Sequence, residues 1–387
     1  MAFLEAVVAA NPVGTAQCST DDTDGHTLAQ QDGTTATQEL HLIVSDSKYR
    51  RITLAARPQG APQDSDFALM EDAVPVPGSG ELLLRTIYLS LDPYMRGRMN
   101  AVKSYVPCVE IGETMVGGAV SEVVSSNVEG FAVGDLVFGY TGWQSHAIHD
   151  GKGLRKLDRG AAPISTALGI LGMPGHTAYV GLLDIGRPQR GETVLVSAAS
   201  GAVGAAVGQI ARIRECRVVG VAGTPEKCRY VVDTLGFDAC VSHRDPDLPA
   251  RLAEACPQGI DIYYDNVGGK VLAAAFELLN DAARVPICGM ISHYNDTAPP
   301  PGPDSLLKFM RGILTRRLTI QGFIIFDHQH RWKDFHDDMA DWIRDGRVTY
   351  REDFVDGLEN AAVAFRGLLE GRNFGKLIVR VGDDPTL

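Results

Sequence analysis

The 387-residue chain contains no uncharged apolar run that approaches the ~18 residues needed to span a membrane. Basic residues are outnumbered, with 36 Lys and Arg against 48 Asp and Glu, and the net charge of −12 argues against a nucleic-acid-binding surface. The seven cysteines are scattered and include no C-x-x-C pair, so they indicate neither a disulfide framework nor a zinc cluster. We therefore expect a cytoplasmic protein with no membrane or nucleic-acid partner.

Residues 1–48 differ from the rest of the chain, because after a short apolar opening they are rich in Thr, Asp, Gln and Ala. The opening carries Glu5 and no basic stretch, which makes it a poor signal peptide, and the acidic content argues against a transit peptide. We interpret this segment as a disordered extension, or as the result of a start codon assigned too early, and expect no chemistry from it.

Two patterns divide the remainder. From Arg51 to about Lys156, short alternating apolar runs are punctuated by Pro and Gly, which indicates a β-rich domain. From about Met173 to Phe326, strands and helices alternate, which predicts an α/β domain with a doubly wound parallel sheet. The six predicted strands are Thr193–Ala199, Arg217–Gly223, Ala239–His243, Asp261–Val267, Arg284–Gly289 and Leu318–Ile325. The predicted boundaries are 49–172 for the first part of the β-rich domain, 173–327 for the α/β domain and 328–387 for a return to the first domain.

The first of these strands runs into a glycine-rich turn, Ala199–Gly204, and then into an apolar helix that keeps small residues. This layout brings backbone N–H groups and a helix N-terminus against a pyrophosphate in dinucleotide-binding sheets. Ala199 stands where the usual fingerprint has its first glycine. The alternative is a close-packed strand, turn and helix that bind nothing.

The second predicted strand ends at Gly223, where NAD-binding sheets place an Asp or Glu on the ribose 2′-hydroxyl. No carboxylate stands at this tip, whereas Lys227 follows one helical turn later, and His243 and Arg244 end the third strand beside it. A lysine and an arginine attract a 2′-phosphate that a carboxylate would repel, so the pattern favours NADP(H). Taken alone, Lys227 could equally be a solvated surface lysine.

The fourth and fifth predicted strands end in further motifs at the same edge of the sheet. Asp265–Gly269 closes the fourth strand, and its two glycines allow the backbone to approach a ligand closely. Cys288–Tyr294 closes the fifth. Either motif alone could be a helix-starting turn, but their shared placement at strand ends indicates a ligand-binding crevice.

These motifs and several others resemble one known family. They are YLSLDPYMRGRM (88–99), LGMPGHTAYVGLLDIG (171–186), AASGAVGAAVGQIA, DIYYDNVGGKV, PICGMISHYN, IQGFII and GRNFGK (371–376). Between about residues 50 and 381 the chain resembles the medium-chain dehydrogenase/reductase superfamily. The resemblance is to its zinc-free leukotriene B4 12-hydroxydehydrogenase/prostaglandin reductase branch, and most of all to the bacterial NADPH-dependent curcumin reductases.

The resemblance implies a GroES-like β-rich domain packed against a Rossmann domain, with NADP(H) in the cleft between them. It places Ala202, Val203 and Gly204 at the pyrophosphate and Lys227 at the 2′-phosphate. It also places Asn266 and Cys288–Tyr294 along the ribose and nicotinamide, with Phe323 to Ile325 and Asn373 closing over the nicotinamide end. His243 is a departure, because reductases of the animal branch have a Tyr at this position.

Zinc-dependent members of this superfamily use a Cys on the early β segment and a Gly-His-Glu motif as catalytic ligands. Here the first segment reads Ser90–Pro93 and the second reads Thr114–Val116, without a thiolate or an imidazole. His146 and His149 are interpreted as polar surface or loop residues. We therefore predict no metal.

Without a metal, the chemistry that needs least help is the reduction of an alkene conjugated to a carbonyl. Hydride delivery to the β-carbon of an enone or enal develops an enolate, which needs only hydrogen-bond donors. The candidate donors are the hydroxyls of Tyr294, Tyr105 and Tyr94, although each could instead be a packing aromatic. The alternatives are an NADP-dependent hydroxyl dehydrogenase or quinone reductase, and a non-catalytic nicotinamide-binding relative.

We also expect a homodimer, by resemblance, through the strand Leu318–Ile325, whose alternating apolar face would otherwise lie on an exposed edge.

Overall fold

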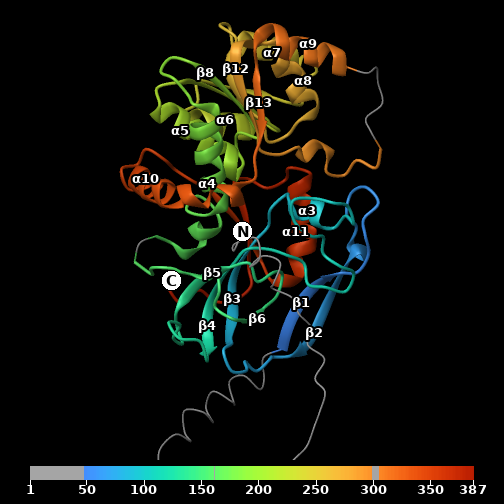
Figure 1. Ribbon diagram of the computed structural model, residues 1–387, viewed down its shortest axis with the longest axis vertical. Coiled ribbons are helices and arrows are strands. Elements are labelled where there is room, and N and C mark those ends of the chain that lie inside the picture. The colour runs from blue at the N-terminus through green and yellow to red at the C-terminus, as the bar shows by residue number, and fades with distance from the viewer. Residues whose placement is uncertain (1–47, 161, 299–304) are drawn as a thin grey trace, which may run out of the picture.

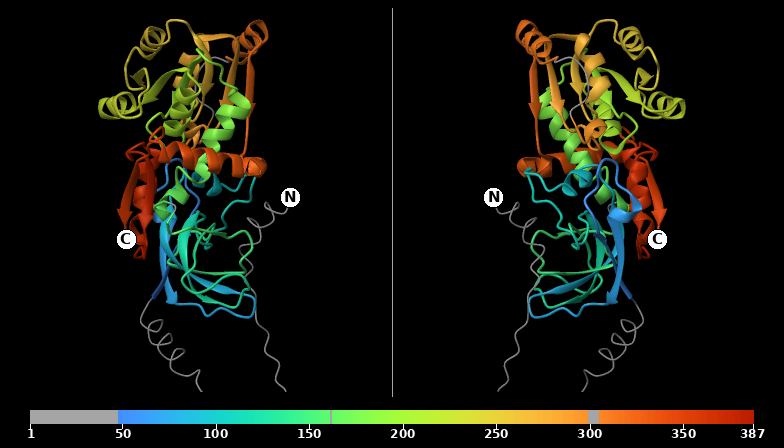
Figure 2. Two further views of the ribbon diagram at one scale, coloured as in Figure 1. Left: turned by 90° about the vertical axis from the view of Figure 1, so that its left-hand side faces the viewer. Right: turned by 90° about the vertical axis from the view of Figure 1, so that its right-hand side faces the viewer.

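The computed structural model describes residues 48–160, 162–298 and 305–387, so the extension predicted at 1–48 lies almost wholly outside the described residues. Figure 1 shows two halves stacked along the long axis, a parallel α/β half and a β-rich half. The two side views show helix α10 lying across the junction between them (Figure 2).

The α/β half is built on a six-stranded sheet in which every neighbouring pair is parallel. The strands are β8 (Thr193–Ser197), β9 (Arg217–Ala222), β10 (Ala239–Ser242), β11 (Ile260–Tyr264), β12 (Leu279–Ile287) and β13 (Thr319–Gly322). Side by side, they lie in the order β10-β9-β8-β11-β12-β13. Numbered by their place in the chain, this order is 3-2-1-4-5-6. This is the Rossmann order, and it confirms the predicted fold class.

Helices cover both faces of this sheet. They include α4 (Met173–Val180), α5 (Ala202–Ile213), α6 (Pro225–Asp233), α7 (Leu248–Ala255), α8 (Gly269–Glu277) and α9 (Leu306–Arg316). Successive residues of β8 alternate between the two cores, since Val194 and Val196 pack with α5 on one face and Leu195 packs with α7 and α8 on the other. This alternation follows from the period of two along a strand.

The predicted strands are correct in place but mostly too long at their carboxyl ends. Strand β8 ends at Ser197 because Ala198 adopts a left-handed conformation (φ 51°) that extended pairing cannot accommodate. Strand β13 ends at Gly322, and Ile325, predicted as its last residue, instead opens a 3₁₀ stretch, Ile325–Arg331. Strand β12, by contrast, begins five residues before the predicted Arg284, at Leu279.

The β-rich half holds a seven-stranded sheet. Six of its strands follow the order β14-β15-β3-β4-β5-β7, and the seventh, β6, pairs with β3. Its strands are β3 (Leu82–Ser90), β4 (Ala119–Ser126), β5 (Leu136–Gly139), β6 (His146–His149), β7 (Arg155–Lys156), β14 (Glu352–Asp356) and β15 (Lys376–Arg380). The last two come from the end of the chain, and β15 pairs antiparallel with β3. A separate antiparallel pair, β1 (Lys48–Leu54) and β2 (Phe67–Ala73), lies beside this sheet.

Several contacts connect the halves, among them those of helix α10 and of the turn before α5. Helix α10 (Trp332–Arg344) packs on α4, where His176 contacts the rings of Trp332 and Phe335. In addition, the turn before α5 forms a parallel bridge between Gly201 and Gly375, the residue that precedes β15. Helix α11 (Ala361–Leu369) precedes this strand. Within the described ranges, no helix combines the length and apolar character that crossing a bilayer requires.

Candidate functional site

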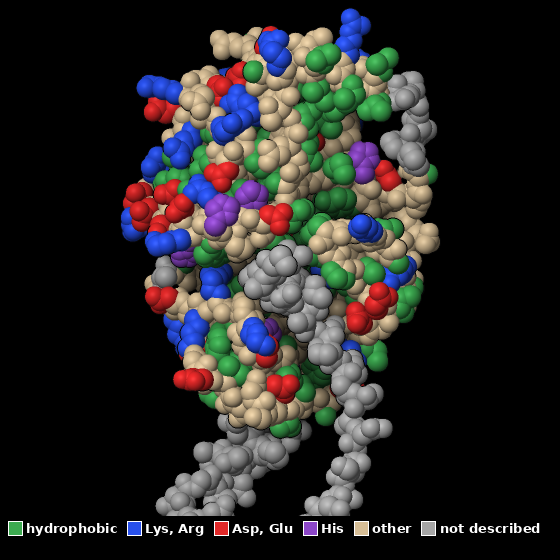
Figure 3. Space-filling view, in the orientation of Figure 1, with side chains coloured by type: hydrophobic (Ala, Val, Ile, Leu, Met, Phe, Trp, Pro, Cys, Tyr) green, Lys and Arg blue, Asp and Glu red, His purple; other side chains and the backbone are tan. Residues whose placement is uncertain are grey.

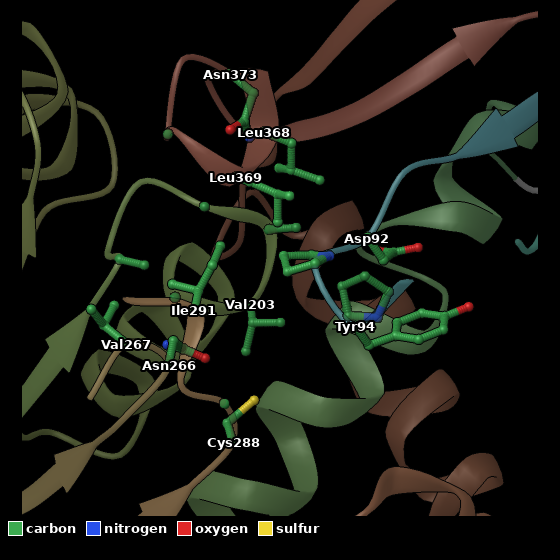
Figure 4. A pocket seen from close by; sticks show the side chains of 18 of the residues that line it. Asp92, Tyr94, Val203, Asn266, Val267, Cys288, Ile291, Leu368, Leu369 and Asn373 are labelled. Atoms are coloured by element: carbon green, nitrogen blue, oxygen red, sulfur yellow. The ribbon is translucent and has the colours of Figure 1, made fainter. Parts of the chain in front are cut away.

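A cavity of about 630 Å³ lies between the carboxyl ends of the parallel strands and loops of the β-rich half. Within the predicted segment Cys288–Tyr294, Met290 and His293 do not line this cavity, but the residues that the sequence analysis assigned individually to a cofactor or catalytic role do. These residues are Tyr94, Tyr105, Ala202, Val203, Gly204, Lys227, His243, Asn266, Cys288, Tyr294, Phe323, Ile325 and Asn373. Figure 4 shows Asn266 and Cys288 on one side of the cavity, with Leu368, Leu369 and Tyr94 across from them.

The glycine turn is shaped by close backbone packing. A Cβ atom on Gly204 would lie 2.3 Å from the carbonyl oxygen of Ala198, so this position accepts only glycine. Ala199 fits in place of the usual first glycine because Gly220 on β9 leaves room for its methyl group: a Cβ on Gly220 would lie 2.8 Å from Ala199 Cβ. Helix α5 begins at Ala202 without a side-chain cap, so its first N–H groups are available to an anion in the cavity.

The turn after β11 is fixed by Asp265, which is fully buried. One of its carboxylate oxygens accepts hydrogen bonds from the Tyr263 hydroxyl (2.8 Å) and from the N–H groups of Val267 and Gly268 (both 2.9 Å). Its carbonyl oxygen accepts from the Cys288 N–H (2.8 Å), which ties the end of β12 to the end of β11. These contacts hold the two strand-end motifs side by side.

Asn266 and Cys288 face the cavity from this tied edge. The Asn266 amide nitrogen donates to the Ser197 carbonyl (2.8 Å), and Figure 4 shows its amide oxygen turned toward the cavity. Burial is the main cause that raises the pKa of the Cys288 thiol to about 12, so the thiol is protonated at neutral pH. Cys288 is therefore a wall of the cavity and not a nucleophile.

Basic side chains gather at the tip of β9. A Cβ on Gly223 would lie 3.2 Å from His243 Nε2 and 4.0 Å from Arg244 Nε, so both side chains lie over this glycine. Lys227 donates to the Gly371 carbonyl (2.7 Å), and burial and Arg244 lower its pKa. The structure thus brings Lys227, His243 and Arg244 together, and Lys270 lines the same cavity.

The three candidate tyrosines differ in their surroundings. The hydroxyl of Tyr294 lies over Gly289, 3.1 Å from where a Cβ would be, and burial raises its pKa. Tyr105 is 44% exposed at the mouth of the cavity. The hydroxyl of Tyr94 points away from Asn266 and Cys288 in Figure 4, and burial raises its pKa well above the usual value. Tyr294 and Tyr105 are therefore better placed as donors than Tyr94.

Sequence reasoning missed a buried ion pair in the cavity wall. Lys376, 4% exposed, donates to the Leu91 carbonyl (2.8 Å), the Asp92 carboxylate (2.9 Å) and the Leu377 carbonyl (3.2 Å). Ser90 donates to the other oxygen of Asp92. Both partners fall in motifs that the sequence analysis quoted, DPYM and GRNFGK, but 284 residues separate them and no local pattern indicates their pairing.

The two segments that the sequence analysis compared with zinc-binding motifs, Ser90–Pro93 and Thr114–Val116, include packed apolar side chains. Leu91 and Met115 are 1% and 0% exposed and belong to the same hydrophobic cluster. His146 and His149 are the first and last residues of strand β6 and not loop residues, and they contact their chain neighbours: the Ser145 hydroxyl lies 3.1 Å from His146 Nδ1, and the Gly151 N–H donates to His149 Nδ1 (3.0 Å). The part of the chain that the structure describes contains no group of three His, Cys, Asp or Glu side chains suited to a metal. These residues do not fit a catalytic zinc.

The fold and the cavity are those of a dinucleotide-binding oxidoreductase, and the comparisons with known proteins agree with this class. A family model for the N-terminal domain of oxidoreductase matches residues 50–157, and one for a zinc-binding dehydrogenase matches residues 202–342. The chain belongs to the medium-chain dehydrogenase/reductase superfamily.

Three members of this superfamily are similar to the chain over most of its length. It is 55% identical to the NADPH-dependent curcumin reductase of Escherichia coli (strain K12), over 87% of this chain and 98% of the relative. It is 42% identical to prostaglandin reductase 1 of Rattus norvegicus, over 85% and 98%. The crystal structure of CurA from Vibrio vulnificus in complex with NADPH superposes with a TM-score of 0.85 at 53% identity, over 87% and 100%.

Proposed function

We propose that this protein is an NADPH-dependent reductase of carbon–carbon double bonds conjugated to a ketone or aldehyde. Relatives with 55%, 42% and 41% identity carry the names NADPH-dependent curcumin reductase, prostaglandin reductase 1 and 2-alkenal reductase (NADP(+)-dependent), the last from Nicotiana tabacum. The observation that carries the proposal is that one cavity is lined by the glycine turn, by the basic cluster at Gly223, and by Tyr294 and Tyr105.

The cavity fits NADP(H) along its length. The uncapped start of α5 offers N–H groups to the pyrophosphate, and a Cβ on Gly204 would close this cradle. Lys227 and Arg244 supply positive charge for the 2′-phosphate. Asn266 and Cys288 line the ribose and nicotinamide end, and Phe323 to Ile325 and Asn373 close it. When bound there, NADPH supplies the hydride.

The protein's part in the chemistry is to stabilise the negative charge that develops on the carbonyl oxygen of the substrate. Tyr294 approaches this region from the end of β12 and Tyr105 approaches it from the opposite wall. Because burial raises the pKa of Tyr294, its hydroxyl stays protonated at neutral pH and donates a hydrogen bond to the forming enolate. The apolar side chains of Ile291, Leu368 and Leu369 line the same cavity.

The experiment that tests this function follows NADPH oxidation with enals, cyclic enones and diarylheptanoids, together with a quinone and a secondary alcohol, and identifies each product. We expect turnover of the conjugated alkenes with saturation of the C=C bond and an intact carbonyl. Turnover restricted to the quinone or the alcohol would replace the proposal with a quinone reductase or a hydroxyl dehydrogenase. The absence of turnover with every substrate would favour a non-catalytic relative.

We also propose a homodimer formed through the edge of the parallel sheet, although the apolar face does not lie where the sequence analysis expected it. The exposed residues of edge strand β13 include Thr319 and Gln321, which are polar. The neighbouring helix α9 instead exposes Leu307 (80%) and Leu314 (78%), and Figure 3 shows apolar side chains gathered over this region. A second copy of this chain would cover the patch. Light scattering at micromolar concentration should give a dimer, and Leu307→Asp should shift it toward monomer; a wild-type monomer would refute it.

A further inference from the structure

His243 occupies the place at the tip of β9 where a cofactor phosphate is expected. Its backbone N–H donates to the Ala222 carbonyl (2.9 Å), which fixes the residue at the junction of β10 and β9. Its Nε2 lies 3.2 Å from where a Cβ on Gly223 would stand, and the imidazole lines the cavity. The ring is therefore held over Gly223, which directly follows β9 and carries no side chain.

The charges that act on this imidazole from the described residues are all positive. Arg244 is its neighbour in the chain, Lys227 approaches from α6, and Lys270 approaches from the start of α8. Burial is the largest cause that lowers the pKa of His243, and these three cations lower it further. The carboxylates of Glu226 and Asp353 act on Lys227, but neither is among the groups that act on His243. Without an anion in the cavity, the ring is neutral at pH 7.

We propose that His243 takes up a proton from solvent when the 2′-phosphate of NADPH binds over Gly223, and that this proton-linked contact contributes to the preference for NADPH over NADH. The inference rests on the proposed use of NADP(H). A phosphate dianion in this position offsets most of the field of the three cations, because it brings two negative charges close to the ring. The protonated ring donates a charge-assisted hydrogen bond to the phosphate, which a neutral ring forms more weakly.

Proton uptake on binding makes the affinity depend on pH. NADPH binds more weakly as the pH rises through the titration range of the complexed ring, and one linked proton changes the dissociation constant by at most about tenfold per pH unit. NADH lacks the 2′-phosphate, so its affinity should not change with the ionisation of His243.

The test measures Kd for NADPH and for NADH by cofactor fluorescence between pH 6.5 and 8.5, without an enone. The range starts at 6.5 because the phosphate's own second pKa is about 6. We expect Kd for NADPH to rise about 3- to 10-fold across the range in the wild type, given one linked proton. His243→Gln and His243→Tyr should flatten this dependence, whereas Lys227→Met should weaken NADPH binding at every pH and keep the slope. NADH should show no slope in any variant.

A second readout counts the protons directly. Isothermal titration calorimetry in two buffers of different ionisation enthalpy gives the number of protons taken up with NADPH, and the wild type should exceed His243→Gln by a measurable fraction of one proton at pH 7.5. Equal proton counts and parallel Kd profiles in the two proteins would overturn the role of His243 while leaving NADPH binding intact. Failure to bind NADPH at any pH would instead overturn the proposed cofactor as well.

Discussion

The two walls of the cavity are constructed in different ways. The wall on the parallel sheet is made of strand ends, where each functional group lies within a few residues of the turn that positions it, as Asn266 does beside Asp265. The opposite wall joins segments that are distant in the chain, Asp92–Tyr94 and Leu368–Lys376, and a buried ion pair connects them. A local motif therefore specifies the first wall, whereas the second depends on long-range pairing of β15 with β3.

The strongest test of this difference removes the ion pair. Lys376→Met deletes three hydrogen bonds and leaves the Asp92 carboxylate buried, which we expect to cost about 3–5 kcal/mol of stability. Urea denaturation should show the loss. Adding Asp92→Leu to Lys376→Met should restore part of it, because the second change removes the uncompensated charge. An unchanged midpoint in the single variant would mean that strand pairing alone holds this wall.

Replacing the tyrosines by phenylalanine tests which wall carries the hydrogen-bond donor to the enolate. Tyr294→Phe keeps the ring and removes the hydroxyl over Gly289, and we expect kcat to fall about 10- to 1000-fold with little change in KM or melting temperature. Tyr105→Phe should lower kcat less, because Tyr105 is 44% exposed and water can replace its hydroxyl. Tyr94→Phe serves as the matched variant with the hydroxyl turned away, and its effect on kcat should be the smallest. Wild-type kcat in both Tyr294→Phe and Tyr105→Phe would reduce these residues to packing.

The basic cluster tests the strand-end wall alone. Lys227→Ala should weaken NADPH binding by about 1.5–3 kcal/mol, as expected for the loss of a hydrogen bond to a charged group. Binding of NADH, which lacks the phosphate, should change less, so the ratio of the two dissociation constants isolates the phosphate contact from the contact of Lys227 with Gly371. Equal kcat/KM for NADPH and NADH in the wild-type protein would contradict the assignment.

The same difference explains what the sequence could predict. The glycine turn, the alternation of strands and helices along the chain and the cluster at Gly223 follow from short-range patterns, and the structure brings the turn and the cluster into one cavity. The pairing of Lys376 with Asp92 could not be predicted, because nothing near either residue specifies a partner 284 positions away. The apolar patch on α9 was also missed, since an amphipathic pattern does not say which face stays uncovered.

The smallest expected effect is that of metal removal. Exhaustive dialysis against a chelator should leave NADPH-dependent activity unchanged, because the segments compared with zinc-binding motifs contain Leu91 and Met115, both packed in the hydrophobic core, and offer no thiolate or imidazole. Elemental analysis before and after dialysis, combined with the enone assay, checks this. One tightly bound zinc per chain, with activity lost on its removal and restored on its return, would show that a metal and not the tyrosines polarises the carbonyl. Unchanged activity, together with the losses in Tyr294→Phe, would assign the stabilisation of the enolate to hydrogen bonds alone.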